Sequence, residues 1–224
     1  MKRRDFILII TLLSIFAFIV VLLETGKIVG IENFVYRNIS LYINPIFTII
    51  VKIITNIGGP VIIAIICLVL CALHQTRMKY GIPVFITVVI SFILNTILKY
   101  IFARQRPSVL RLINETSYSF PSGHSMINAA LYTIIILLLL KNADKKGKRI
   151  IVSISLVILF LIIGLSRVYL GVHYFGDVLA GWILGVFVAF IVYLVIKYFQ
   201  KIIFIKNCHI VIYGSFFEVI FCII

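Results

Sequence analysis

Residues 166–177 read SRVYLGVHYFGD and place three ionisable side chains, Arg167, His173 and Asp177, at one end of an apolar segment. Inserting a charged side chain at the centre of a bilayer costs about 2.5–3.5 kcal/mol on insertion scales, so ionisable residues in an apolar segment indicate a functional role. His173 and Asp177 are four residues apart and would share one face of a helix. The carboxylate could then accept the Nδ1 proton of the imidazole and leave Nε2 free as a nucleophile or base. Arg167 supplies a permanently charged fork suited to phosphate.

The composition around this stretch is that of a membrane protein. The chain has 224 residues, of which 63% are hydrophobic and 12% charged, and its mean hydropathy is +1.22. These values exclude an ordinary soluble domain. The formal charge of +14 is explained by basic loops beside membrane spans, so we expect no nucleic-acid partner.

Apolar runs of about 18–20 residues cross a bilayer, and the sequence predicts six such spans. They lie at residues 6–23, 58–73, 82–102, 121–140, 150–166 and 175–197. The first is interpreted as a retained span, because no small-residue cleavage site follows it. The apolar segment 46–54 is expected to lie in the membrane interface. The predicted fold is therefore an all-α, polytopic six-helix bundle.

We expect a single membrane-embedded domain over residues 1–206, with a motif core at 59–197. The apolar tail 207–224 has no assigned role; it could be a seventh span or an interfacial helix, and peripheral association with the membrane is favoured. Basic residues gather in the segments that a cytoplasmic N-terminus would place inside the cell. The positive-inside rule then predicts a multi-pass protein of the cell membrane with its motif loops on the extracytoplasmic face.

A second motif is KYIFARQRP at residues 99–107. Lys99 and Arg106 are seven positions apart, about two helical turns, so both cations can face one way if the helix continues that far. Each cation alone is more typical of a side chain that reaches from a span end to the interface.

A third motif, PSGH at residues 121–124, opens the fourth predicted span. A helix N-terminus offers free backbone N–H groups to an anion, and Gly123 permits close approach to the backbone. Ser122 adds a hydroxyl group and His124 an imidazole. A simple helix start with a capping serine explains this motif alone, but does not explain three cations, two histidines and an aspartate at the outer ends of four spans.

Together the three motifs resemble those of the type 2 phosphatidic acid phosphatase (PAP2) family, the membrane relatives of vanadium haloperoxidases. The family pattern is Lys, six residues, Arg-Pro; Pro-Ser-Gly-His; and Ser-Arg, five residues, His, three residues, Asp, and this chain matches every position. The resemblance implies that His173 forms a phosphohistidine, that Asp177 orients it, and that His124 protonates the leaving group and then activates water. The implied phosphate-binding residues are Lys99, Arg106, Arg167, Ser122 and Gly123.

The implied activity is hydrolysis of a lipid phosphate monoester or pyrophosphate, without a metal or other cofactor. Candidate substrates are phosphatidylglycerophosphate, phosphatidate and undecaprenyl pyrophosphate. The alternatives are a lipid phosphotransferase of the same fold and a non-enzymatic lipid-binding or transport protein. Three pairs of residues other than the matched motif positions also carry predictions. Asn95 and Asn128 are expected to form inter-helix hydrogen bonds, and Gly181 and Gly185 a helix-packing face. Arg104 and Arg111 would meet a second phosphate, a headgroup or solvent.

Overall fold

The computed structural model describes residues 2–108, 111–141 and 146–213, with side chains omitted at Lys146 and at 201–213. Every regular element in these ranges is helical, which confirms the all-α prediction. The elements are α1 (Arg3–Glu24), α2 (Val29–Ser40), α3 (Pro45–Ile57), α4 (Pro60–Ala72), α5 (His74–Thr76), a π-helical turn (Arg77–Gly81), α6 (Ile82–Phe102), α7 (Gly123–Lys141), α8 (Lys146–Tyr169) and α9 (Phe175–Tyr213).

Six helical segments are long and apolar enough to cross a membrane, as predicted. They are Arg3–Glu24, Pro45–Ala72, His74–Phe102, Gly123–Lys141, Gly147–Tyr169 and Phe175–Gln200. Large apolar side chains such as Phe18, Leu68 and Phe92 are exposed on the outside of the bundle. This exposure is the arrangement that a lipid solvent requires, because hydrocarbon surrounds the spans.

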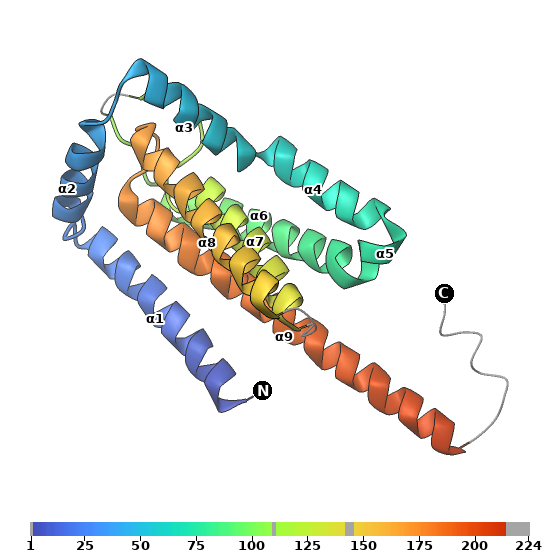
Figure 1. The fold of residues 1–224 in the computed structure, drawn as a ribbon. Helices are drawn as coiled ribbons and strands as arrows, with labels where there is room; N and C mark the ends of the chain where they lie inside the picture. The colour runs from blue at the N-terminus through green and yellow to red at the C-terminus, as the bar shows by residue number, and fades with distance from the viewer. Residues whose placement is uncertain (1, 109–110, 142–145, 214–224) are drawn as a thin grey trace.

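The segment expected to be an interfacial helix instead joins α4 in one apolar segment, Pro45–Ala72, that is long enough to cross a membrane. Helix α3 continues almost in line into α4 (Figure 1) and contacts α8 through a hydrogen bond of 2.9 Å between Thr48 Oγ1 and Tyr169 Oη. The helix is interrupted at Gly58-Gly59, and Pro60 begins α4 at a position where no backbone donor is needed. The Gly-Gly-Pro sequence therefore marks a break within the span rather than its start.

Helix α7 forms the centre of the bundle and packs closely on α9. Met126, Leu131 and Ile134 of α7 are fully buried. A Cβ at Gly181 would lie 2.8 Å from the carbonyl oxygen of Ser122, and one at Gly185 would collide with the carbonyl of Met126. The predicted small-residue face is thus confirmed, since larger residues would push α9 away from α7.

Two buried amides connect the neighbouring helices, as predicted. Asn95 of α6 donates to the carbonyl of Pro121 at 3.1 Å, and Asn128 of α7 donates to the carbonyl of Gly58 at 2.8 Å. The second bond satisfies a carbonyl group that the break between α3 and α4 leaves free.

The motif residues gather at the end of the bundle that holds α2 and the turn between α8 and α9 (Figure 1). The N-terminus of α1 lies at the opposite end. Helix α9 continues without a break past residue 206 to Tyr213; the rest of the tail lies outside the described residues, so its boundary and role stay predictions.

Candidate active site

His173 and Asp177 form a buried pair at the start of α9. His173 lies in the turn before the helix rather than on it, and Asp177 is in the first helical turn. Nδ1 of the histidine lies 3.5 Å from Oδ2 of the aspartate. The hydroxyl group of Ser119 donates to the same Oδ2 at 2.5 Å and lies 3.3 Å from Nδ1. The backbone N–H of Tyr174 also donates to Oδ2, at 2.9 Å.

The other ring nitrogen of His173 faces a cation. Nη1 of Arg106 lies 3.2 Å from Nε2. A guanidinium group can only donate, so Nε2 accepts and the ring proton is placed on Nδ1, towards Asp177. Burial lowers the pKa of His173 to about 4, and Asp177 opposes this shift. At neutral pH the imidazole is therefore uncharged, with a lone pair on Nε2.

Lys99 and Arg106 reach the site in different ways. Helix α6 ends at Phe102, and Ala103 turns the chain with a left-handed backbone conformation (φ 42°), so Arg106 approaches from a loop. Both cations hold the same residue: Arg106 donates from Nε to the carbonyl oxygen of Ser117 at 2.6 Å, and Lys99 donates to the Ser117 hydroxyl at 3.1 Å. The shared partner brings the two predicted phosphate ligands together.

Arg167 is almost fully buried at the end of α8. It donates from Nη1 to Thr55 Oγ1 at 2.9 Å and forms an ion pair with Glu115. Its Nε has no hydrogen-bond partner among the described residues. Glu115 also lies 3.8 Å from Nη2 of Arg106. A carboxylate therefore occupies the space between two predicted phosphate ligands.

The PSGH motif is tied to Asp177 through the backbone. The N–H of Ser122 donates to the carbonyl oxygen of Asp177 at 3.0 Å, and the buried hydroxyl of Ser122 lies 2.9 Å from that of Ser125. A Cβ at Gly123 would lie 3.1 Å from Oδ1 of Asn95, so packing gives a first reason for this glycine. Phosphate binding by Ser122 and Gly123 stays a prediction.

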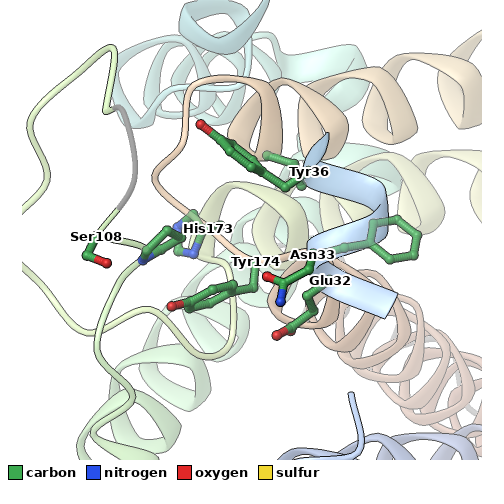
Figure 2. Close-up of a pocket in the computed structure, with 9 residues that line it drawn as sticks. Glu32, Asn33, Tyr36, Ser108, His173 and Tyr174 are labelled. Carbon is green, nitrogen blue, oxygen red and sulfur yellow. The ribbon is translucent and has the colours of Figure 1, made fainter. Parts of the chain in front are cut away.

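The two histidines line different cavities. His124, Arg167 and Glu115 line one cavity of about 400 Å³, whose rim includes Lys52. His173 and Tyr174 line a second cavity of about 160 Å³. Figure 2 shows that side chains from α2 enter this second cavity across from His173; they are Glu32, Asn33 and Tyr36.

The expectation that Arg104 meets a headgroup, a second phosphate or solvent is wrong. Its guanidinium group forms ion pairs with Glu32 at 2.7 Å and with Asp177 at 2.6 Å. Arg111 donates to the carbonyl oxygen of Pro107 at 2.6 Å. The prediction for Arg104 failed because its partner Glu32 lies far away in the sequence. Only the folded chain brings the two side chains together.

Three further residues contact the predicted site residues, and none of them belongs to the sequence motifs. They are Glu115, Ser117 and Ser119. The available signal is their position in a polar loop directly before the PSGH motif. No group of three or more His, Cys, Asp or Glu side chains placed to hold a metal ion occurs within residues 2–108, 111–141 and 146–213.

Comparisons with known proteins agree on one family. The family model of the PAP2 superfamily matches residues 80–201. Phosphatidylglycerophosphatase B of Bacillus subtilis is 45% identical over 102 residues, which are 45% of this chain and 50% of that protein. The chain thus spans about half the length of this relative in the alignment. Undecaprenyl-diphosphatase of Sulfolobus acidocaldarius is 32% identical over 177 residues, covering 74% of this chain and 81% of that protein.

A solved structure gives the same result for the fold. The crystal structure of a transmembrane PAP2-type phosphatidylglycerolphosphate phosphatase from Bacillus subtilis superposes with a TM-score of 0.75 at 29% identity. The superposition covers 86% of this chain and 96% of that one. The six-helix arrangement is therefore shared over nearly the whole of the neighbour.

Proposed function

Because this chain belongs to the PAP2 superfamily, we propose that it is a multi-pass membrane phosphatase that hydrolyses a phosphate monoester or pyrophosphate of a lipid. The observation that carries the proposal is the environment of His173. Nδ1 faces a buried carboxylate at 3.5 Å, while Nε2 faces a guanidinium group at 3.2 Å. A neutral imidazole held between an orienting acid and an anion-binding cation is arranged for attack on phosphorus.

The substrate phosphoryl group would bind among Lys99, Arg106 and Arg167. Among the described residues the Nε of Arg167 has no partner and offers one donor, and displacement of Glu115 would release more. In phosphoryl transfer, negative charge is spread over the equatorial oxygens, so fixed cations around them stabilise the transition state. These side chains carry that stabilisation without a metal ion in the proposed reaction.

In the first chemical step, Nε2 of His173 forms a bond to phosphorus and the bond from phosphorus to the lipid oxygen breaks. His124, in its protonated form, donates a proton to the departing oxygen; such a proton transfer contributes about 10²–10⁴-fold. The ring of His173 gains positive charge, which Asp177 stabilises. In the second step, neutral His124 takes a proton from water, the water oxygen bonds to phosphorus, and the P–N bond breaks to restore neutral His173.

The substrate class is supported by the relatives, whose names describe a phosphatidylglycerophosphatase and an undecaprenyl-diphosphatase. We propose phosphatidylglycerophosphate, phosphatidate or undecaprenyl pyrophosphate. The same phosphohistidine could pass its phosphoryl group to an alcohol, so a lipid phosphotransferase is the second candidate. For orientation we propose a cytoplasmic N-terminus and an extracytoplasmic site, in line with their positions at opposite ends of the bundle.

The test is release of inorganic phosphate by the purified full chain in detergent micelles, with each of the three lipids. Wild type should release phosphate from at least one lipid without an added acceptor, and the matched variant His173→Gln should release none. Phosphate transfer that occurs only when an acceptor alcohol is added would favour the phosphotransferase. Lipid binding without turnover in either assay would refute an enzymatic role.

A further inference from the structure

A network of buried charges connects α2 to the proposed catalytic carboxylate. Arg104 donates from Nη1 to Oδ1 of Asp177 at 2.6 Å, and from Nη2 to Oε2 of Glu32 at 2.7 Å. Nη1 also lies 3.0 Å from Oε1 of Glu32, which makes this pair bidentate. The side chain of Glu32 is 3% exposed and that of Asp177 is fully buried. Water therefore screens these charges weakly.

The backbone at the start of α9 is shaped to admit this network. A Cβ at Gly176 would lie 2.7 Å from Oε1 of Glu32, so a larger residue would displace the carboxylate. The N–H of Gly176 also donates to Glu32. The guanidinium carbon of Arg104 lies 4.1 Å from the ring centre of Tyr174, a cation–π contact. Glu32 and Arg104 are thus held directly behind the turn that carries His173.

The two oxygens of Asp177 have separate partners. Oδ1 receives the hydrogen bond from Arg104, while Oδ2 receives those from Ser119 and the Tyr174 backbone and faces Nδ1 of His173. Rotation of the carboxylate would break bonds on both sides. Arg104 therefore fixes the orientation in which Oδ2 meets the imidazole.

The sum of the charges gives Glu32 a distinct role. A positive guanidinium group paired with Asp177 alone would cancel the charge that stabilises an imidazolium. Burial raises the pKa of Glu32, while the bidentate pair with Arg104 lowers it and favours the carboxylate. With Glu32 ionised, two carboxylates and one guanidinium group leave one net negative charge behind His173. Burial opposes the charge on Arg104, yet hydrogen bonds and charge from its two carboxylate partners raise its pKa above the ordinary value.

The two arginines that act on His173 make this net negative charge necessary. Arg106 and Arg167 both disfavour positive charge on the ring, and Asp177 opposes them. Tyr174 contributes a neutral ring that packs on Arg104. A phosphohistidine formed in this setting needs negative charge on the Nδ1 side of the ring.

We propose that Arg104 and Glu32 are positioning residues for the reaction: Arg104 orients Asp177, and Glu32 balances the charge of Arg104 so that Asp177 can stabilise the ring of His173. This inference rests on the proposed function, in which His173 becomes phosphorylated. It also places α2, outside the three motifs, in support of the catalytic pair.

The test compares Glu32→Gln with the double variant Glu32→Gln/Arg104→Gln. The single variant leaves the charge of Arg104 unbalanced, so kcat should fall about 10- to 100-fold while KM changes by less than about threefold. The double variant removes both charges and restores one net negative charge at Asp177. Its kcat should therefore exceed that of Glu32→Gln, although its orientation of Asp177 is weaker. A purely structural role predicts the reverse order.

A second measurement does not depend on turnover. In histidine-selective ¹⁵N NMR, with His173→Gln used for assignment, the pKa of His173 should fall in Glu32→Gln and return towards wild type in the double variant. Glu24→Gln, at an exposed position at the end of α1, should match wild type in both assays. If wild type hydrolyses no lipid phosphate, the proposed function fails, and the NMR result alone still decides the positioning role.

Folding is checked for every variant by gel filtration and thermal unfolding in detergent. If Glu32→Gln does not fold, Glu32→Asp takes its place, with Glu24→Asp as its control. The Glu32→Asp variant keeps the negative charge, so the pKa of His173 should equal the wild-type value in that variant. The proposal is overturned if the pKa of His173 is unchanged in folded Glu32→Gln, if the double variant is no more active than that single variant, or if Glu32→Asp shifts the pKa.

Discussion

The carboxylate of Glu115 forms an ion pair with the guanidinium group of Arg167, and its second oxygen lies 3.8 Å from Nη2 of Arg106. Both arginines belong to the family motifs, whereas Glu115 does not. An anionic side chain thus occupies the space between two cations that would bind substrate phosphate. Its side chain is 29% exposed and lies on the wall of the larger cavity, so substrate could displace it.

Replacing Glu115 with Gln should tighten substrate binding. The amide keeps the shape of the side chain but removes the charge that competes with phosphate for Arg167 and Arg106. KM for a lipid phosphate, and the inhibition constant of orthovanadate, should each fall about three- to tenfold with little change in kcat. Steady-state kinetics in mixed micelles measures both values, with Glu24→Gln as the matched control. A rise in KM would instead make Glu115 a substrate-binding residue.

Acid should destabilise the wild-type fold through His173. Its pKa is lowered by burial, so between the ordinary histidine pKa near 6.5 and the lower folded value the unfolded state binds a proton that the folded state does not. Stability is therefore present above pH 6.5 and is lost as the pH falls through this window, by on the order of 1 kcal/mol at pH 5.5. Thermal unfolding of wild type and His173→Gln at pH 7.5 and 5.5 measures the difference. An equal loss in both proteins would contradict the prediction.

Local patterns in the sequence predict much of this structure. Hydropathy locates the spans because lipid selects long apolar runs, and the motifs include His173, Asp177 and Arg106, which the structure places together. Segment 46–54 was misplaced because an apolar helix next to Gly-Gly-Pro fits an interfacial position as well as half of a broken span. Only its packing along α8, through Thr48 and Tyr169, separates the two.

The missed parts of the site depend on tertiary contacts. Glu32 and Arg104 are 72 residues apart in sequence, and Glu115 meets Arg167 across 52 residues. No local spacing rule links such pairs. They become neighbours only because α2 packs over the start of α9 and because the loop after α6 folds back across the turn that carries His173.

Activity should persist without divalent metal. Lys99, Arg106 and Arg167 provide the positive charge that a metal ion would otherwise supply to the phosphoryl oxygens. We expect the rate of phosphate release in excess EDTA to stay within about twofold of the untreated rate. Loss of activity in EDTA that Mg²⁺ restores would refute the proposed mechanism. Orthovanadate, which mimics five-coordinate phosphorus, should inhibit in the presence of the chelator.

The proposed orientation can be tested with single cysteines. In a background with all four native cysteines replaced by serine, Ser108→Cys should react in intact cells with a thiol reagent that cannot cross the membrane. Lys148→Cys, in the first turn of α8, should react only after the membrane is made permeable. Both expectations follow from the positive-inside rule. The opposite labelling pattern would place the active site in the cytoplasm.

The two histidines of the site should differ in the covalent intermediate. His173 has Asp177 beside its Nδ1 to stabilise the positive ring of a phosphohistidine, whereas no acidic residue lies within four positions of His124 in the sequence. His173→Ala should therefore form no phosphoenzyme. His124→Ala should lose turnover far more for lipids than for an activated aryl phosphate, because a good leaving group needs little protonation.

Rapid-quench trapping of radiolabelled phosphate on each variant separates these roles. A phosphohistidine should accumulate in His124→Ala with the aryl substrate, since its breakdown needs the same base. Asp177→Asn should keep the fold and lower kcat by about 10⁴-fold, the effect of losing an orienting carboxylate in a catalytic triad. Label retained on His173→Ala would move the nucleophile elsewhere. An equal loss for both substrates in His124→Ala would show that His124 does not protonate the leaving group, because acid catalysis must depend on the basicity of the departing oxygen.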